Sequence, residues 1–362
     1  MRRFNRIEMA FVRLWAIGVL CVALLCGCQA KPAGVSGGMA SDSSAAGKRI
    51  APAESADLPE LGSSESAVSG VSPLPSSVPS AAGAVSSKKP AAASTALPDG
   101  AVVTAGACPV YKTASAKAEQ VTQAIYNQPL TVLARSGGFL RVKVVDGYEG
   151  YVQEKNVTVA LDSLRDTGLR LMVRVPVAEA ARSGGGHVKI PLCTELWSTG
   201  LQGNSYTVLL PEGQTGTISA AAVTDITAGR KKDTAEQLIQ TARQFLSPKT
   251  PYLWGGVTAL DGMDCSGFTY MCYRLCGVDL PRDSSPQSAV GAMVNLADIT
   301  AGDQVFFSTN PGGTKVTHTG ICIGDGQFIH SSTGNKGVAV NRMDEAYYRD
   351  RLVVIRRREL AD

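Results

Sequence analysis

Residues 252–266 read YLWGGVTALDGMDCS and run directly into GFTYMCYRLCG, residues 267–277. Apolar side chains recur in the second stretch at the spacing of a buried helical face: Phe268, Met271, Cys272 and Leu275. Gly277 follows the last of them and is the residue type that ends such a helix. The two stretches therefore predict a loop that turns into a buried helix at Cys265.

Cys265 is predicted to occupy the first turn of this helix. A helix N-terminus presents unpaired amide groups and a partial positive charge. Both favour thiolate over thiol, so we expect the pKa of Cys265 to lie below the free value of about 8.5. A single cysteine is often just a small buried hydrophobe, and the choice between the two interpretations depends on what lies near it.

Alternating apolar residues downstream predict three strands. They cover residues 303–307 (DQVFF), 316–323 (VTHTGICI) and 327–331 (QFIHS), and the last two are joined by Gly-Asp-Gly at 324–326. The glycine-rich joint predicts a hairpin.

The chain has three histidines, and two of them, His318 and His330, flank this hairpin. With a three-residue loop, Ile323 opposes Gln327 and Gly320 opposes His330, which places the two imidazoles on the same face. A two-residue loop would place them on opposite faces, so the prediction requires the glycine-rich turn to take the bulged form. With a thiol at a helix start, such a pair forms the nucleophile, base and orienter set that thiol chemistry requires.

The middle of the chain, residues 101–227, is rich in alternating β-branched residues and predicts short strands. Residues 141–158 (RVKVVDGYEGYVQEKNVT) align without gaps on 207–224 (TVLLPEGQTGTISAAAVT). Asp146-Gly147 matches Glu212-Gly213, an acidic-glycine turn. A repeat of this length predicts one small all-β domain present twice.

The two copies differ at aromatic positions. Tyr148 and Tyr151 in the first are Gln214 and Thr217 in the second. We infer that the first copy has a contact surface that the second lacks, although tyrosine is also enriched in strands for packing alone.

The amino terminus has the polarity of a signal peptide. Arg2, Arg3 and Arg6 precede an apolar run at residues 14–25, which is shorter than a membrane span. The run ends Leu-Cys-Gly-Cys at 25–28, which resembles the lipobox of bacterial lipoproteins and implies that Cys28 is acylated, although Cys26 is unusual at the middle position. An ordinary secreted protein is the alternative.

Residues 29–99 are Ser, Ala, Pro and Gly with scattered charges and no aromatic residue, so they cannot build a core. We expect a tether spanning about 45 Å at rest. The length of 362 residues and the apolar content of 44% allow two or three domains beyond it. The net charge of +4 is too small and dispersed to indicate nucleic-acid binding.

Residues 234–245 (TAEQLIQTARQF) predict a helix capped by Thr234 that opens a last domain. From there to the end, four segments occur in order: PYLWGG, MDCSGFTYMCYR, LPRDSSPQS and HTGICIGDGQFIHSS. Together they resemble the NlpC/p60 cysteine peptidases of bacterial cell walls. The repeats resemble bacterial SH3 domains, and the whole architecture is similar to the γ-D-glutamyl-L-diamino acid endopeptidases of the YkfC type.

The resemblance implies two all-β SH3-like barrels followed by an α+β papain-like domain. We expect five regions, namely a lipoprotein signal peptide, a linker, two SH3-like domains and the catalytic domain, at residues 1–28, 29–99, 100–162, 163–230 and 231–362. It also implies a protein of the cell envelope, held to a membrane through its lipid and acting as a monomer.

By the same resemblance, the nucleophile falls on Cys265, the base on His318, the third polar residue on His330 and the oxyanion-stabilising tyrosine on Tyr252. The positions that line the substrate cleft match Asp264, Ser266 and Ser284. No cofactor is implied.

The implied substrates are peptidoglycan stem peptides or muropeptides, cut at the bond between γ-D-Glu and the diamino acid. Stems with a free N-terminal L-Ala would be selected by Asp264 with Glu119 and Tyr148, with Tyr151 as the alternate aromatic. Cleavage of intact cross-linked wall, another thiol chemistry and non-hydrolytic wall binding remain open, as does the choice between diaminopimelate and lysine.

The remaining cysteines are expected to be structural. Cys272, Cys276 and Cys322 fall at core positions, and Cys108 and Cys193, one in each repeat, are able to pair in an exported protein. A zinc site on Cys265 and the two histidines is disfavoured, because no paired-cysteine spacing accompanies them.

Overall fold

The computed structural model describes residues 100–159 and 168–362. The signal peptide, the acylated Cys28 and the tether predicted for the first 99 residues lie outside this part of the chain. Among the described residues, no helix is long and apolar enough to cross a bilayer.

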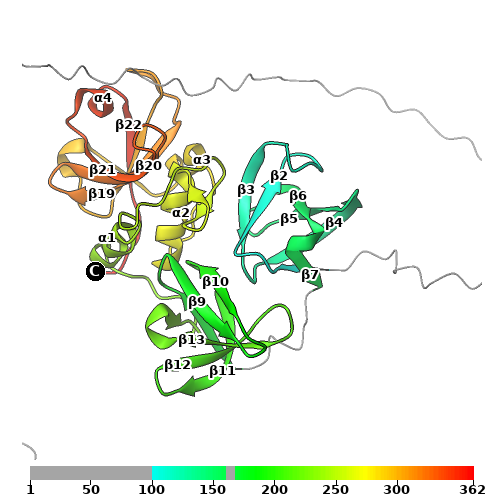
Figure 1. Ribbon diagram of the computed structural model, residues 1–362. Helices are drawn as coiled ribbons and strands as arrows, with labels where there is room; N and C mark the ends of the chain where they lie inside the picture. Colours follow the sequence, from blue (N-terminus) through cyan, green and yellow to red (C-terminus); the bar gives the residue numbers. More distant parts are fainter. Residues whose placement is uncertain (1–99, 160–167) are drawn as a thin grey trace, which may run out of the picture. The chain divides into compact units, whose positions relative to one another are not determined.

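The first β-unit is a seven-stranded antiparallel sheet in the order β3-β2-β6-β5-β4-β1-β7 (Figure 1). Its strands are β1 (Ala101–Val103), β2 (Ala107–Tyr111), β3 (Gln120–Ile125), β4 (Pro129–Ser136), β5 (Phe139–Lys143), β6 (Glu149–Gln153) and β7 (Val157–Val159). Buried and more exposed residues alternate along β2, β5 and β6, as expected of strands with one face on a core.

The second β-unit has the equivalent strand order, β10-β9-β13-β12-β11-β8-β14. Its strands are β8 (Leu169–Val173), β9 (Val177–Arg182), β10 (His187–Pro191), β11 (Glu195–Gln202), β12 (Ser205–Leu209), β13 (Thr215–Ser219) and β14 (Val223–Asp225). Each of β11 to β14 begins 66 residues after its counterpart, as β12 does after β5. The repeat seen in the sequence is therefore a repeat of strands.

The turn after β5 shows why the acidic-glycine pair recurs. Gly147 and Gly213 both have positive φ, 92° and 84°, which glycine adopts without steric cost. The Gly147 amide donates to the Val144 carbonyl, and the Gly213 amide donates to the Leu210 carbonyl, each over 3.0 Å. One backbone turn is thus preserved in both copies.

The C-terminal unit is built on a six-stranded antiparallel sheet in the order β17-β22-β18-β19-β20-β21. Its strands are β17 (Ala292–Val294), β18 (Gln304–Phe307), β19 (His318–Gly324), β20 (Gln327–Ser332), β21 (Gly337–Arg342) and β22 (Leu352–Arg357). A separate pair, β15 (Val257–Thr258) and β16 (Gly262–Met263), precedes them. The three strands predicted for this region are confirmed.

Four helices accompany the sheet: α1 (Ala235–Arg243), α2 (Cys265–Leu275), α3 (Ser284–Ser288) and α4 (Ala346–Arg349). Thr234 caps α1 as predicted, and Gln237 is its partner in the capping box. Helix α2 packs on β19 and β20 and against α1 (Figure 1).

Helix α2 is buried around its whole circumference from Cys265 to Tyr273, not on one face alone. Its apolar side chains belong to the main core of this unit, with Phe245, Ile321 and Ile329. The Cys193 thiol of the second β-unit donates to the Met271 carbonyl over 3.4 Å. Because the helix is packed on all sides, the position of Cys265 in its first turn is fixed.

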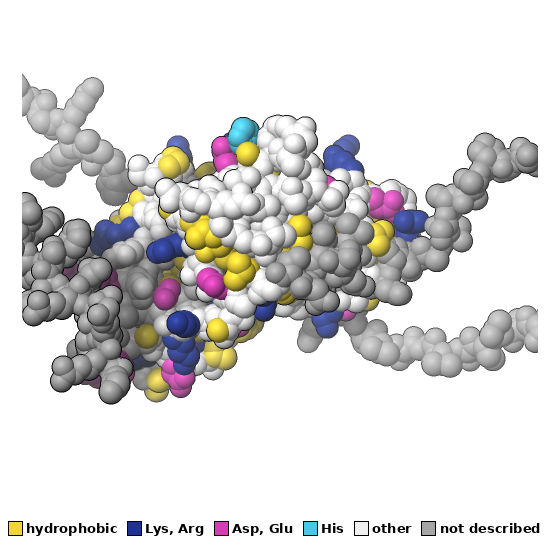
Figure 2. All heavy atoms as spheres, turned by 90° about the horizontal axis from the view of Figure 1, so that it is seen from below, with side chains coloured by type: hydrophobic (Ala, Val, Ile, Leu, Met, Phe, Trp, Pro, Cys, Tyr) yellow, Lys and Arg dark blue, Asp and Glu magenta, His cyan; other side chains and the backbone are white. Residues whose placement is uncertain are grey.

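The surface carries charges of both signs. On the face that Figure 2 shows, Lys and Arg side chains are interspersed with Asp and Glu and with small hydrophobic patches. This agrees with the low net charge of +4.

Candidate active site

The amino end of α2 is fixed by Asp264. The Asp264 side chain accepts a hydrogen bond from the Gly267 amide over 2.6 Å, which makes it the N-cap and Cys265 the first helical residue, as predicted. The Cys265 sulfur accepts hydrogen bonds from the backbone amides of Thr319 and Ser266. Because Thr319 follows His318, these bonds bring the thiol to the start of β19.

The thiol is buried, with Cys265 only 8% exposed. Burial raises the pKa of Cys265 to about 12, the neighbouring Asp264 carboxylate acts in the same direction, and the two amides offset only part of this. The expectation of a depressed pKa was therefore wrong, because loss of solvent outweighs the helix N-terminus. Cys265 is a thiol at neutral pH, and a base must remove its proton during the reaction.

The raised pKa has a measurable consequence. We expect iodoacetamide to alkylate Cys265 more slowly than a free thiol at pH 6 to 8, with a rate that rises with pH across that range, since the thiolate is the reactive species. The modified residue is identified by peptide mass spectrometry. A rate at pH 6 that exceeds that of free cysteine and stays flat up to pH 8 would show that the thiolate is already formed.

The candidate base is His318, at the first position of β19. Its Nε2 lies 2.6 Å from Nδ1 of His330 on β20, and the two rings are nearly perpendicular, at 81°. Burial, and secondarily the charge of His330, hold the pKa of His318 well below its usual range. Burial lowers the pKa of His330 to about 4. Both imidazoles are thus neutral at neutral pH, as a general base and its orienting partner must be.

The hairpin reaches this geometry by a different turn from the one predicted. Gly324 pairs with Gln327, so the loop has two residues, and a bulge between Cys322 and Gly324 shifts the register. Beyond the bulge, Ile321 pairs with Ile329. This is the same register as the expected pairing of Gly320 with His330. The extra residue in the bulge places His318 and His330 on the same face of the sheet, whereas a two-residue loop without a bulge would place them on opposite faces.

Tyr252 lies in the loop before α2 and forms an isolated bridge with Met263. Burial raises the pKa of Tyr252, and charge on Cys265 and Asp264 adds to the effect. The phenol therefore keeps its proton close to the thiol. A phenol that keeps its proton can donate a hydrogen bond.

Asp264 is also one half of a buried ion pair with Arg282, a residue of the segment LPRDSSPQS. Arg282 donates from both terminal nitrogens to the two carboxylate oxygens, over 2.7 and 3.1 Å. The Gly255 amide donates to the same carboxylate over 2.9 Å. These contacts occupy both oxygens of Asp264, and this argues against a role for its carboxylate in contacting a substrate ammonium directly.

The other expected cleft residues lie around this pair. Ser266 donates to Asp264 over 3.2 Å and accepts from Arg282 over 3.0 Å. Ser284 is the first residue of α3, directly after Asp283. Asp264, Ser266 and Arg282 therefore belong to one hydrogen-bond network.

Strand β3 of the first β-unit lies along the loop that carries Tyr252. Gln123 donates to Asp261 over 3.1 Å and accepts from the Val257 amide over 2.9 Å. Gln120 donates to the Trp254 carbonyl over 2.9 Å. The Arg282 side chain also donates to Thr122 over 3.1 Å. These contacts join the first β-unit to the loop that precedes Cys265.

Tyr148, the aromatic residue predicted for the contact surface of the first copy, also contacts the C-terminal unit. Its hydroxyl donates to the carboxylate of Asp283. The alternate, Tyr151, pairs with Tyr111 inside the first sheet. Glu119 forms an ion pair with Lys112 over 3.4 Å. Of the residues expected from the first copy, Tyr148 alone forms a hydrogen bond to the C-terminal unit within the described part of the chain, and Asp283 is the acid that accepts it.

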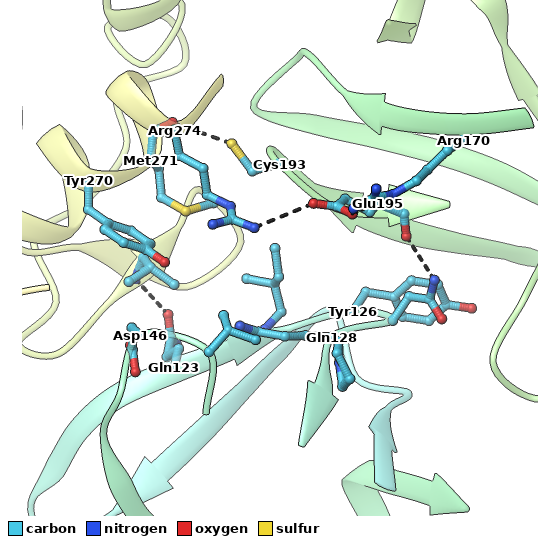
Figure 3. Close-up of a pocket in the computed structure, with 15 residues that line it drawn as sticks. Gln123, Tyr126, Gln128, Asp146, Arg170, Cys193, Glu195, Tyr270, Met271 and Arg274 are labelled. Atoms are coloured by element: carbon cyan, nitrogen blue, oxygen red, sulfur yellow. Dashed lines mark hydrogen bonds and ion pairs between the residues drawn. The ribbon is translucent and has the colours of Figure 1, made fainter. Parts of the chain in front are cut away.

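A cavity of about 260 Å³ lies elsewhere, lined by residues of both β-units and of α2 (Figure 3). Three of its charged groups pair with one another: Glu195 accepts from Arg170 and from Arg274, the latter over 3.5 Å. Cys265 and the histidines are not among its lining residues.

The other cysteines of the described chain are free and buried. Cys272 and Cys276 belong to the core around α2, and Cys322 belongs to a second core cluster, as predicted. Cys108 and Cys193 lie in separate cores as thiols, so the disulfide that the sequence left open is not formed.

Comparison with known proteins agrees with this geometry. The NlpC/P60 family matches residues 249–357, and the bacterial dipeptidyl-peptidase Sh3 domain matches residues 110–157. A γ-D-glutamyl-L-lysine dipeptidyl-peptidase of Bacillus subtilis (strain 168) is 30% identical over 247 residues, which cover 65% of this chain and 80% of that protein. One from Bacillus cereus (strain ATCC 10987 / NRS 248) is 31% identical over 239 residues, covering 60% and 69%.

Among solved structures, an NlpC/P60 family protein from Bacillus cereus matches with a TM-score of 0.66 at 26% identity, over 71% of this chain and 99% of that one. The first β-unit is therefore an SH3-like domain, and the C-terminal unit is the catalytic domain. This chain belongs to the NlpC/P60 family and is a cysteine peptidase.

Proposed function

We propose that this peptidase hydrolyses the bond between γ-D-Glu and the diamino acid of peptidoglycan stem peptides. The contact between His318 and His330 supports it most directly, because it places a neutral base at the start of β19, where the Thr319 amide meets the Cys265 sulfur. The names of the two Bacillus relatives support the choice of bond.

In this reaction His318 takes the proton of the Cys265 thiol as sulfur attacks the γ-carbonyl carbon of D-Glu. The Tyr252 hydroxyl and the Cys265 amide hold the oxyanion. His318 then gives the proton to the leaving amine of the diamino acid. Water, deprotonated by the same imidazole, attacks the thioester and releases D-Glu with its N-terminal residue.

The first SH3-like domain supports selection of stems with a free N-terminal L-Ala. An ammonium group that loses water in a cleft needs a carboxylate to offset its burial and gains further from a ring face. Tyr148 of the first SH3-like domain supplies the ring, and Asp283 of the catalytic domain supplies the carboxylate. We therefore assign the acidic role to Asp283 in place of Asp264, and we keep Glu119 as a further acid to test.

Acetylation of the substrate tests this selection. We expect N-acetyl-L-Ala-γ-D-Glu-diaminopimelate to be cleaved with a kcat/KM about 100-fold below that of the free amine, a loss of about 3 kcal/mol. Asp283→Asn should narrow this ratio by weakening cleavage of the free amine, and Glu119→Gln reports whether that acid contributes. Tyr151→Phe is the matched control and should leave the ratio unchanged.

Equal cleavage of the two peptides by the natural enzyme would show that no pocket recognises the amine. The alternative function, an endopeptidase of intact cross-linked peptidoglycan, would then be favoured. If acetylation matters but Asp283→Asn behaves as the natural enzyme, the pocket exists on other residues.

We further propose that the second β-unit is a second SH3-like domain, so that the regions 100–162, 163–230 and 231–362 are separate domains. The equal strand order of the two sheets supports this. The expected envelope location agrees with a peptidoglycan substrate, and the monomeric state stays a prediction.

Anchoring at Cys28 is the remaining proposal. Cys28→Ser is expected to remove fatty-acid labelling and leave the protein at its precursor size, because the acylated residue is also the processing site. Metabolic labelling with a fatty acid followed by electrophoresis measures both. Undiminished labelling of the variant would place the lipid elsewhere, and Cys26→Ser is the matched control.

A further inference from the structure

His330 continues into a chain of polar side chains beyond the three catalytic positions. Its Nε2 lies 3.0 Å from Oδ1 of Asn341 on β21. The other end of that amide, Nδ2, donates to the carboxylate of Glu345 over 3.2 and 3.4 Å. Asn335 donates to the same Asn341 oxygen over 2.8 Å. The amide of Asn341 therefore stands between an imidazole and an acid.

Glu345 determines which way this amide points. An ionised carboxylate only accepts hydrogen bonds, so it must face the NH2 group of Asn341 and leave the oxygen toward His330. Glu345 is itself held in place, because the Arg342 amide donates to it over 2.8 Å. The donor from Asn335 selects the same orientation, since an NH2 group needs an oxygen opposite it.

The orientation of Asn341 sets the tautomer of His330. An oxygen 3.0 Å from Nε2 requires a proton on that nitrogen, because two lone pairs would otherwise face each other. A neutral imidazole has only one ring proton, so Nδ1 of His330 becomes an acceptor. Asn335 and the Tyr348 hydroxyl approach Nε2 less closely, at 3.3 and 3.4 Å, so the Asn341 contact decides.

The same logic passes to His318. Its Nε2 lies 2.6 Å from the accepting Nδ1 of His330 and must therefore donate. The single ring proton of His318 is then on Nε2, and Nδ1 is left with a free lone pair. The opposite tautomer of His330 would donate to His318, force the proton onto its Nδ1 and leave no base for the thiol.

We propose that Asn341, oriented by Glu345, is a positioning residue that fixes the proton of His330 on Nε2 and so makes Nδ1 of His318 the catalytic base. The proposal rests on the proposed function, in which His318 deprotonates Cys265. Asn341 acts through His330 alone and needs no contact with substrate.

The first test reads the tautomers without substrate. The chain has only three histidines, and His187 is exposed on β10, so nitrogen-15 labelling of histidine gives the half-buried His318, the buried His330 and one solvent reference. Proton–nitrogen correlation spectra at neutral pH should show both His318 and His330 protonated on Nε2. A proton on Nδ1 of either residue in the natural protein would overturn the proposal.

The second test uses substitutions. Asn341→Leu removes the acceptor at similar volume, and we expect kcat to fall about 10- to 100-fold with KM unchanged, with His330 shifting toward the Nδ1-protonated form. The double variant Asn341→Asp with Glu345→Gln exchanges the acid and the amide, keeps an acceptor toward His330, and should retain kcat within a few-fold.

A matched control is Asn295→Leu. It removes a hydrogen bond of the same kind, from Asn295 Nδ2 to Asp298 over 3.3 Å, that touches no histidine. Its kcat and tautomers should be those of the natural protein. Unchanged kcat or unchanged tautomers in folded Asn341→Leu would contradict the proposal. If Cys265→Ala still cleaved peptide, the proposed function would fail, while the tautomer spectra would stand on their own.

Discussion

Cys265→Ala is expected to abolish peptide cleavage, and His318→Ala is expected to lower kcat by about 10³- to 10⁴-fold. Removing the sulfur removes the atom that attacks the carbonyl, whereas removing the imidazole leaves a thiol whose raised pKa keeps it protonated. Release of L-Ala-D-Glu, measured by mass spectrometry at saturating substrate, gives kcat for each variant. Chelators should leave the activity of the natural enzyme unchanged.

Cys272→Ala is the matched control, because it removes a buried thiol from the same helix without touching the site. It should cleave peptide as the natural enzyme does. Cleavage that survives in Cys265→Ala, or that is lost in chelator and restored by zinc, would sink the thiol mechanism.

The acid limb of the pH profile follows from the histidines. The pKa of His318 is held below its ordinary value of 6.5, so the neutral base is present above the lowered pKa and is lost only as the pH falls through it. We expect kcat/KM to stay level from pH 8 down past pH 6.5 before it falls. A decline centred at 6.5 would mean that the imidazole is solvated.

Arg282→Met is expected to lower the free energy of unfolding by about 3–5 kcal/mol. The Arg282 side chain is 2% exposed and that of Asp264 is 10% exposed, so removing the guanidinium leaves a buried carboxylate without its counter-charge at the cap of α2. The denaturation midpoint of the purified protein, followed by tryptophan fluorescence and circular dichroism, measures the loss.

Two further variants separate the charge from the packing. Arg282→Met with Asp264→Asn should recover part of the stability, because no unpaired charge then remains. Arg342→Met breaks an exposed pair with Asp344, whose side chains are 50% and 65% exposed, and should leave the midpoint unchanged. An Arg282→Met midpoint equal to that of the Arg342 variant would show that the buried pair does not stabilise the cap.

Local patterns predicted much of the fold. The helix start at Cys265 followed from an apolar period and a capping glycine, and the repeated strands followed from aligned turns, because both depend on residues close together in the chain. The register of the histidine pair and its dependence on a bulge were predicted correctly. The loop length was wrong, because the bulge lies at Ile323, before a two-residue turn, and no residue type marks that position in the sequence.

What the sequence did not predict depends on contacts between distant segments. Arg282 meets Asp264 across 18 residues, and His330 meets Asn341 across a neighbouring strand. The pKa of Cys265 follows from burial by the folded chain, which a helix position alone does not specify. The contact between Asp283 and Tyr148 joins the C-terminal unit to the first β-unit, and local sequence patterns do not specify how two such units pack.

The most direct measurement is the identity of the products from L-Ala-γ-D-Glu-L-Lys-D-Ala and its diaminopimelate counterpart, determined by liquid chromatography and mass spectrometry with the purified enzyme. We expect L-Ala-D-Glu together with the dipeptide of the diamino acid and D-Ala, and no products with Cys265→Ala. Cleavage at the bond to D-Ala, or intact peptides with an enzyme whose Cys265 is unmodified and whose fold is native, would contradict the proposed reaction.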